Sequence, residues 1–321
     1  MAGPGWAGNP AAGGQAVGAA GRLSRRGRRD RPGRSAPFLV CNGATVLLIM
    51  LFSVGPLAYV GYLSLVDLKA GQVVGAFVGM DNYRFVLQDR STITAFQNTF
   101  YFSTVSVILA TAIGTGIALL LDSDAPWTKL LLAAAVLPWA IPEVVNALMW
   151  KWIFDFHWGA LNAVLKGLRL IDAYVAWFST GVTAMHALIF AYSWKLVPFV
   201  VLTLYAALRT ISPEVIESAQ LDGAGAFGLF RYVTLPLIMP AMAVAILLCV
   251  IFSMRAFDLA YLLTRGGPGE STTVLSYYTY AKTFEFGDFG AGSAVSVVLA
   301  ASTFVIIVLY WWMLQRAEPE Q

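Results

Sequence analysis

Long apolar runs, separated by shorter polar stretches, set the organisation of this chain. A membrane-spanning helix needs about 20 largely apolar residues to cross the hydrocarbon of a bilayer. The apolar runs predict six such spans, at residues 38–66, 96–121, 129–153, 178–205, 236–263 and 291–314. The pattern therefore predicts an all-α, polytopic membrane protein, with its spans in one domain of residues 38–315 and a short C-terminal tail of residues 316–321.

The segment of residues 206–235 differs from the other connections because it is neither apolar nor turn-like. Ser212 followed by Pro213 predicts a helix start, with serine as the N-cap and proline at the first helical position. We expect Glu214 and Glu217 in the first turn, where carboxylates suit the positive end of the helix dipole. The segment thus predicts a helix held just outside the membrane.

Two glycines then interrupt this helix. Gly223 and Gly225 break or bend it, and a second short helical piece is expected over residues 226–233. Pro236 follows, where the next apolar run begins. We interpret the whole segment as a bent helical hairpin that offers a knob to a partner rather than a pocket.

The same segment carries a motif with fixed spacing, Glu217-Ser218-Ala219, Asp222-Gly223-Ala224, Phe230 and Leu235-Pro236. It resembles the "EAA" loop of ABC-importer permeases, although Ser218 stands where that family has a second alanine. The resemblance implies a coupling helix that docks into a cytoplasmic ATPase, and the alternative is an amphipathic loop with glycine turns. The implied coupling residues are Glu214, Glu217, Ser218, Ala219, Asp222, Gly223, Ala224, Phe230 and Pro236.

Other connections resemble elements of sugar-importer permeases. These are Gly-Met-Asp-Asn-Tyr at 79–83, the turn at 155–162, Thr-Arg-Gly-Gly-Pro-Gly at 264–269 with the following Ser-Thr-Thr, and the entry to the last span at 284–296. The resemblance covers residues 38–315 and implies the type I ABC importer permease fold. The Gly-Gly-Pro-Gly run lacks the lysine and the strand–helix context of a phosphate-binding loop, so a plain turn is the better interpretation.

Composition supports a membrane protein and argues against several other classes. The chain of 321 residues is 58% hydrophobic and 12% charged, whereas soluble domains have about 25% charged residues. Cys41 and Cys249 both fall in apolar runs, so neither a disulfide framework nor a cysteine-based metal site is expected. His157 and His186 have no companion ligands at metal spacing, and no metal site is predicted.

The N-terminal segment of residues 1–37 is rich in glycine, alanine and proline, with seven arginines between Arg22 and Arg34. Such a segment cannot bury enough apolar area to fold alone, so we expect disorder. Arg25-Arg26 could suggest a twin-arginine signal, but the following apolar run is too long and lacks a cleavage site. A cytoplasmic tail that fixes topology is favoured over a nucleic-acid-binding patch.

An even number of spans places both termini on one side of the membrane. With the arginine-rich tail inside, eleven Lys and Arg residues are cytoplasmic and seven are in outer loops. This bias agrees with the positive-inside rule. We therefore expect a multi-pass protein of the bacterial inner membrane with cytoplasmic termini, and residues 206–235 on the side where an ATPase could bind.

Ionisable residues within spans are costly and usually mark a pathway or a pair. Lys151 lies beside tryptophans near the outer end of its span, where snorkelling to the interface explains it. Arg255 and Asp258 are expected to neutralise each other on one helix face. Glu143 follows Pro138 and Pro142, which loosen the helix and free backbone carbonyls towards a cavity, and a pair between Glu143 and Lys195 is the alternative. Lys195 also precedes a helix breaker, Pro198.

In sugar importers that this chain resembles, the substrate sits between spans about halfway across the membrane. Aromatic faces against sugar C–H groups and polar groups against hydroxyls are the chemistry expected there. The resemblance implies that residues 137–143, 192–199 and 253–261 line the pathway. The candidates within these stretches are Trp139, Glu143, Tyr192, Phe199, Ser253, Arg255 and Tyr261. Packing between helices is the alternative for each aromatic residue, and the partner permease could supply the contacts instead.

The resemblance implies a permease subunit of a binding-protein-dependent ABC importer for a sugar or related polyol. Its implied partners are a second homologous permease, two ATPase subunits that bind ATP and Mg²⁺, and an extracytoplasmic binding protein. The chain itself is expected to bind no cofactor and to catalyse no reaction, since it has no Walker A sequence or catalytic constellation. An ion-coupled secondary transporter with Glu143, Lys195 and Asp258 as a relay is the second hypothesis, and an integral-membrane enzyme is the third.

Overall fold

The computed structural model describes residues 42–43, 45–123 and 125–317. The predictions for the tail of residues 1–37, for Cys41 and for residues 318–321 lie outside this part of the chain. The chain divides into two compact units, residues 1–55 and 56–321. The described part of the first unit is helical and includes the π-helical turn Met50–Val54.

Among the described residues, five helices are long and apolar enough to cross a membrane. The pair α5 (Thr128–Ala140) and α6 (Glu143–Ile153) passes the same test jointly but is bent by 106°. Counted as one span, this pair completes the six spans that the sequence predicts. The other five are Thr45–Leu63, which ends in α2 (Gly55–Leu63); α4 (Arg90–Leu121); α8 (Gly181–Leu208); Ala226–Met254; and α13 (Phe289–Ala317), of which Phe289–Arg316 passes the test.

Short elements connect the spans. On the side of α2 these are the strands β1 (Val66–Asp67) and β2 (Ala76–Phe77), which pair antiparallel with Val66 opposite Phe77, and the helix α3 (Asp81–Gln88). The remaining connections contain α7 (Ala160–Gly167), α9 (Pro213–Leu221), α12 (Leu275–Tyr280) and the π-helical turns Ala260–Thr264 and Ala281–Glu285.

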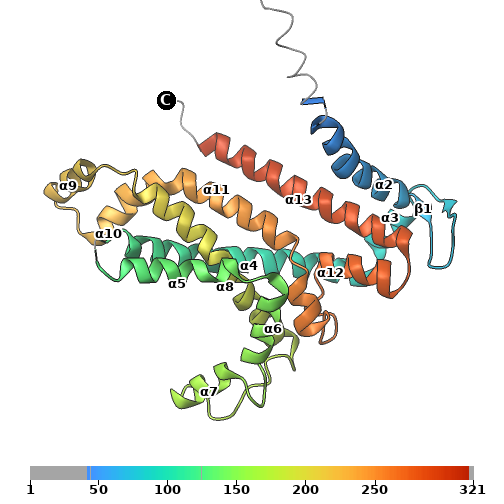
Figure 1. The fold of residues 1–321 in the computed structure, drawn as a ribbon, viewed down its shortest axis with the longest axis horizontal. Helices are drawn as coiled ribbons and strands as arrows, with labels where there is room; N and C mark the ends of the chain where they lie inside the picture. The colour runs from blue at the N-terminus through green and yellow to red at the C-terminus, as the bar shows by residue number, and fades with distance from the viewer. Residues whose placement is uncertain (1–41, 44, 124, 318–321) are drawn as a thin grey trace, which may run out of the picture. The chain divides into compact units, whose positions relative to one another are not determined.

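Helix α8 forms the centre of the core, with α4, α5 and α11 (Leu235–Met254) packed around it (Figure 1). About two thirds of its apolar window, 67%, is buried within the chain. Leu188, Val200 and Leu204 are among its fully buried side chains. Helices α6 and α7 leave this bundle to one side, because the bend after α5 turns the chain away.

Two predicted helix boundaries are wrong. The fifth span ends at Met254 and not at residue 263, so Arg255 and Asp258 do not share one helix face. Ser276 at the start of α12 donates a hydrogen bond to the carbonyl of Ala256, which lies beyond the helix end. The short helix expected over residues 226–233 is also not separate, because α10 (Ala226–Leu229) continues through the π-helical turn Phe230–Thr234 into α11.

The two ends of the bundle are built differently. In Figure 1, α9 and α10 lie at one end, and β1 and α3 lie at the opposite end. At the second end, the Asn82 side chain donates to the carbonyls of Ser64 and Val66 at 3.0 Å each. Gly290 at the start of α13 approaches the Val66 carbonyl so closely that a Cβ atom would collide with it. The motifs around Asn82 and Gly290 therefore hold α3 and the start of α13 against residues 64–66.

Candidate functional site

The bent span leaves backbone carbonyls without helical partners in the middle of the apolar chain. Pro138 lies inside α5, and Pro142 is the N-cap residue of α6. Between the two helices Ile141 is extended, with φ −79° and ψ 127°. Carbonyls at a broken helix end need other donors. The two prolines thus interrupt the helix and free backbone carbonyls, as predicted. The size of the bend, 106°, could not be predicted from them.

Lys195 on α8 supplies those donors. Its ammonium group hydrogen-bonds the carbonyl of Ile141 and that of Trp139, the latter at 3.5 Å. It also lies 3.8 Å from Oε1 of Glu143, the first residue of α6. The pair between Glu143 and Lys195, which the sequence offered as an alternative, is confirmed. Lys195 therefore connects the end of α5, the start of α6 and the centre of α8.

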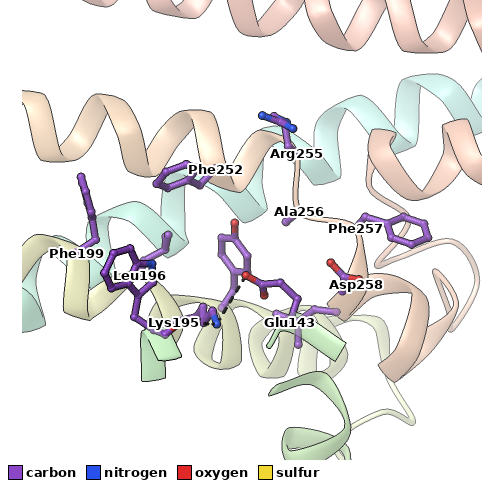
Figure 2. A pocket seen from close by; sticks show the side chains of 12 residues that line it. Glu143, Lys195, Leu196, Phe199, Phe252, Arg255, Ala256, Phe257 and Asp258 are labelled. Carbon is purple, nitrogen blue, oxygen red and sulfur yellow. Dashed lines mark hydrogen bonds and ion pairs between the residues drawn. The ribbon is translucent and has the colours of Figure 1, made fainter. Parts of the chain in front are cut away.

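A cavity of about 370 Å³ opens beside this connection (Figure 2). Five residues that the sequence proposed for the pathway line it, namely Trp139, Glu143, Tyr192, Phe199 and Arg255. They come from α5, α6, α8 and the end of α11. The other lining residues are Lys195, Leu196, Phe252, Ala256, Phe257, Asp258 and Leu259.

Two residues proposed for the pathway do not line this cavity. The Ser253 side chain is buried, and its hydroxyl bonds the Ser103 hydroxyl of α4 and the Val250 carbonyl. Tyr261 stacks on Phe257, with ring centroids 5.2 Å apart and an interplanar angle of 15°. Tyr261 thus lies behind the ring of Phe257, which itself lines the cavity.

Sequence reasoning missed Phe252 as a cavity residue and, although Phe257 lies in the predicted stretch of residues 253–261, did not single it out. Phe252 contacts the ring of Phe199 edge-on, with centroids 6.0 Å apart. Phe252 ends a run of apolar residues, so its local sequence is the same as that of a lipid-facing helix. The available signal was the nearby charged pair Arg255 and Asp258, which marks this stretch as exposed to something other than lipid.

The loop between α8 and α11 forms the second candidate site. Ser212 is the N-cap residue of α9 and Pro213 its first helical residue, as predicted, but the Ser212 side chain makes no capping bond to the backbone. Glu214 lies in the first turn, whereas Glu217 lies beyond it, so that part of the prediction is wrong. The backbone N–H of Glu214 and the Ser212 hydroxyl hold the pKa of the Glu214 carboxyl below its usual value.

Gly223 ends α9 with a left-handed residue at φ +88°. The N–H of Gly223 donates to the Gln220 carbonyl, and the N–H of Ala224 donates to the Ala219 carbonyl, each at 3.0 Å. These two bonds define a Schellman motif, in which glycine is favoured because it has no Cβ. No heavy atom lies within 4 Å of the position that a Cβ on Gly223 would take.

Apolar side chains are exposed along this loop. Leu221 is 89% exposed, and Val215, Phe227 and Tyr232 are also exposed. No residue of α9 is buried within the chain. Within the described part of the chain, no group of His, Cys, Asp and Glu residues is placed to hold a metal ion.

Comparison with known proteins gives a family. The model of the binding-protein-dependent transport system inner membrane component family matches residues 110–319. The trehalose/maltose transport system permease protein MalF of Thermococcus litoralis is 37% identical over 73% of this chain and 77% of its own length. The sulfoquinovosyl glycerol transport system permease protein SmoG of Agrobacterium fabrum is 34% identical over 86% of this chain and 88% of its own length.

Solved structures give the fold. A chain of a bacterial ABC transporter involved in the import of the acidic polysaccharide alginate matches with a TM-score of 0.77. The match covers 89% of this chain and 98% of that chain, at 22% sequence identity. The same kind of match, with a TM-score of 0.76, is found for the alginate transporter in complex with its pentasaccharide-bound periplasmic protein. The expected type I ABC importer permease fold is thereby confirmed.

Proposed function

Because the chain belongs to the family of binding-protein-dependent transport system inner membrane components, we propose that it forms half of the translocation pathway of an ATP-driven sugar importer. Two relatives above 30% identity are permeases for a sugar or a sugar derivative, which supports a sugar or related polyol as the substrate. A second, homologous permease supplies the other half of the pathway. An extracytoplasmic binding protein delivers the substrate.

The observation that carries this proposal is a cavity built at a break in a membrane span. Trp139, Phe199 and Phe252 offer ring surfaces, and Glu143 offers a carboxylate among them. Rings bind the apolar faces of a sugar, and a few placed polar groups fix its orientation. Ser253 and Tyr261 support the walls from behind in this arrangement. Broken helices line the substrate sites of many membrane transporters, which supports a pathway at this break.

The loop of α9 and α10 is proposed as the contact with the ATPase subunits, which bind ATP and Mg²⁺. Its exposed Leu221 and Phe227 suit a partner surface, since exposed apolar patches rimmed by polar residues mark interaction sites. Glu217, Ser218 and Asp222 supply the polar rim. The continuous helix Ala226–Met254 joins this loop to the cavity residue Phe252. Movement of the ATPases would therefore reach the pathway through one rigid element.

The test uses the substitution Gly223→Asp, with Gly225→Asp as the matched control. Gly225 has an ordinary φ of −72°, and no atom lies within 4 Å of its Cβ position. Side chains are disfavoured at the left-handed Gly223, so the Schellman motif is expected to distort while the spans stay folded. We expect Gly223→Asp to lower sugar-stimulated ATP hydrolysis on the order of 10-fold in proteoliposomes, a loss of about 1.4 kcal/mol in coupling.

The assay needs the full chain with its co-expressed permease, ATPase and binding-protein subunits. Trehalose, maltose, cellobiose and glycerol are the first compounds to screen. Normal uptake by the Gly223→Asp complex would contradict the coupling role. Uptake that is driven by an ion gradient, with no ATPase subunit bound to the chain, would overturn the importer function and favour a secondary transporter.

A further inference from the structure

We propose that the cavity selects uncharged sugars and rejects anionic ones, with Glu143 as the residue that accepts hydrogen bonds from sugar hydroxyls. This inference rests on the proposed function and names the charge class of its substrate. Four charged side chains line the cavity: Glu143, Lys195, Arg255 and Asp258. Their net charge is zero, so selectivity depends on which of them a ligand can reach.

Lys195 is not available to a ligand. An ammonium group has three donors, and three acceptors surround this one: the carbonyls of Trp139 and Ile141 and Oε1 of Glu143. Only 9% of the Lys195 side chain is exposed. Loss of these bonds would leave two partly buried carbonyls at the break without a donor, which is costly in an apolar region. Lys195 is therefore a positioning residue, which holds Trp139 and Glu143 at the cavity wall.

Arg255 does not neutralise the carboxylates either. Figure 2 shows its guanidinium directed away from Glu143 and Asp258. It also borders a second groove, with Ser276 on α12 and Thr303 on α13. Within the described part of the chain, no carboxylate oxygen lies within 4.0 Å of the Arg255 nitrogens. Arg255 thus borders both hollows, with its charge directed away from the carboxylates of the first.

The carboxylates remain accessible. The Glu143 side chain is 49% exposed and, among the described residues, makes no hydrogen bond beside its ion pair with Lys195. Asp258 is partly exposed on the same cavity. An ionised carboxylate only accepts hydrogen bonds, so it fits hydroxyl donors. An anionic substituent within about 5 Å of such a group would bind on the order of 100-fold more weakly at the effective dielectric of partly buried sites.

The ring surfaces favour the same class of ligand. Trp139 is 61% exposed and Phe252 is also exposed, so each of the two rings has surface that a ligand can reach in this chain. A pyranose has apolar C–H faces for these rings and a rim of hydroxyl donors for Glu143 and Asp258. A uronate, sulfonate or phosphate would place its charge at that rim. The half-pathway that this chain supplies is therefore complementary to an uncharged sugar.

The test compares neutral sugars with matched acids. Trehalose, maltose and cellobiose are each paired with the uronate in which one hydroxymethyl group is a carboxylate. Uptake is measured in proteoliposomes that contain the full complex, with the binding protein kept the same throughout. Because the binding protein is unchanged, a change in the acid-to-neutral uptake ratio between variants comes from the permease.

We expect the wild-type complex to favour the neutral member of each pair. The double substitution Glu143→Gln and Asp258→Asn should raise the acid-to-neutral ratio by about 10-fold or more, since both repulsive charges are removed. Asp172→Asn, an exposed carboxylate outside the cavity, is the control and should leave the ratio unchanged. Glu143→Asp should keep the wild-type ratio, because the charge is retained.

Three outcomes decide between the claims. An acid-to-neutral uptake ratio that does not rise in the double variant would overturn the charge selectivity, while sugar uptake itself upholds the proposed function. The same rise in the ratio in Asp172→Asn would also overturn it, because the effect would then not belong to the cavity. Absence of ATP-dependent uptake of every compound would overturn the proposed function, and the inference with it.

Discussion

Asp89 joins the start of α4 to α12 through hydrogen bonds. It is the N-cap residue of α4, and its Oδ2 accepts from the Thr92 N–H at 3.1 Å and from the Thr92 hydroxyl at 2.9 Å. The Tyr278 hydroxyl of α12 donates to the same oxygen at 2.5 Å. One carboxylate thus joins residues that are far apart in the sequence. Hydrogen bonds to an ionised acceptor are the stronger kind.

These bonds determine the acid sensitivity of this site. Burial favours the neutral carboxyl, but the hydrogen bonds from Tyr278 and Thr92 and the charge of Lys282 outweigh burial, so the pKa of Asp89 lies below its ordinary value. A carboxyl with a depressed folded-state pKa adds stability that is present above the unfolded pKa, about 4 for aspartate. That contribution is lost as the pH falls through the folded-state value.

We expect Asp89→Asn to lower the free energy of unfolding at pH 7 by about 1 kcal/mol, because asparagine still caps the helix but forms weaker hydrogen bonds. The difference from wild type should shrink as the pH is lowered from about 5 to 3, since the wild-type carboxylate becomes protonated. Thermal unfolding of the purified chain in detergent measures both effects. Tyr278→Phe, which removes one donor, should show a similar trend, and a difference that is constant with pH would contradict the argument.

At the residue scale, the sequence predicted chemistry where a residue interrupts an apolar run. Pro138, Pro142 and Glu143 stand out in this way. The structure has the break in the span at the two prolines, and Glu143 forms an ion pair with Lys195. Phe252 does not stand out, since an aromatic ring in an apolar run suits lipid, a neighbouring helix or a cavity equally. Which of these it contacts depends on the packing of helices that are distant in the sequence.

At the element scale, the contact between α4 and α8 depends on small side chains. Ala110, Gly114 and Ala118 lie four residues apart on α4 and are all buried. A Cβ on Gly114 would lie 2.7 Å from side-chain atoms of Val200, which is fully buried on α8. Small residues at this spacing let two membrane helices approach closely, and van der Waals contact then stabilises the pair.

We expect Gly114→Ala to lower the free energy of unfolding by about 1–3 kcal/mol, since Val200 cannot move away without displacing the core. Gly116→Ala is the matched control on the same helix, because no atom lies within 4 Å of its Cβ position. It should be neutral or stabilise the helix by up to about 1 kcal/mol. Thermal unfolding in detergent compares the two, and an equal loss of stability in both variants would show that close packing at Gly114 is not the cause.

Element boundaries followed from the sequence only where local signals mark them. The start of α9 at Ser212-Pro213 and its end at Gly223 were predicted from capping and from glycine. The end of α11 at Met254 has no proline or glycine beside it. A hydrogen bond from Ser276 to the Ala256 carbonyl accompanies that end, and such a contact between distant segments cannot be read from the local sequence.

At the scale of the whole molecule, the cavity lies between two differently built ends. The end with α9 offers exposed apolar side chains on a short helix, whereas the opposite end, with β1 and α3, is held together by the hydrogen bonds of Asn82 (Figure 1). The number of spans and the excess of Lys and Arg residues in some connections were available from the sequence. The link between the α9–α10 loop and the cavity could not be predicted from the sequence, because it depends on the unbroken helix Ala226–Met254.

The orientation of these ends in the membrane can be tested with single cysteines. Leu221 on α9 and Val73 in the β1–β2 connection are 89% and 96% exposed, so a thiol at either position would be open to a water-soluble maleimide. Both native cysteines are first replaced by alanine. With the arginine-rich tail inside, the positive-inside rule places Leu221 in the cytoplasm and Val73 outside.

We therefore expect a membrane-impermeant maleimide to label Val73→Cys in intact spheroplasts. Leu221→Cys should be labelled only after the membrane is permeabilised, because a loop that contacts the ATPase subunits, as we propose for α9, must face the compartment that holds ATP. Labelling of both positions after permeabilisation is the control for reactivity. The opposite pattern would place α9 outside, where no cytoplasmic ATPase could reach Leu221 or Phe227. Coupling through this loop would then be excluded, whatever the cavity binds.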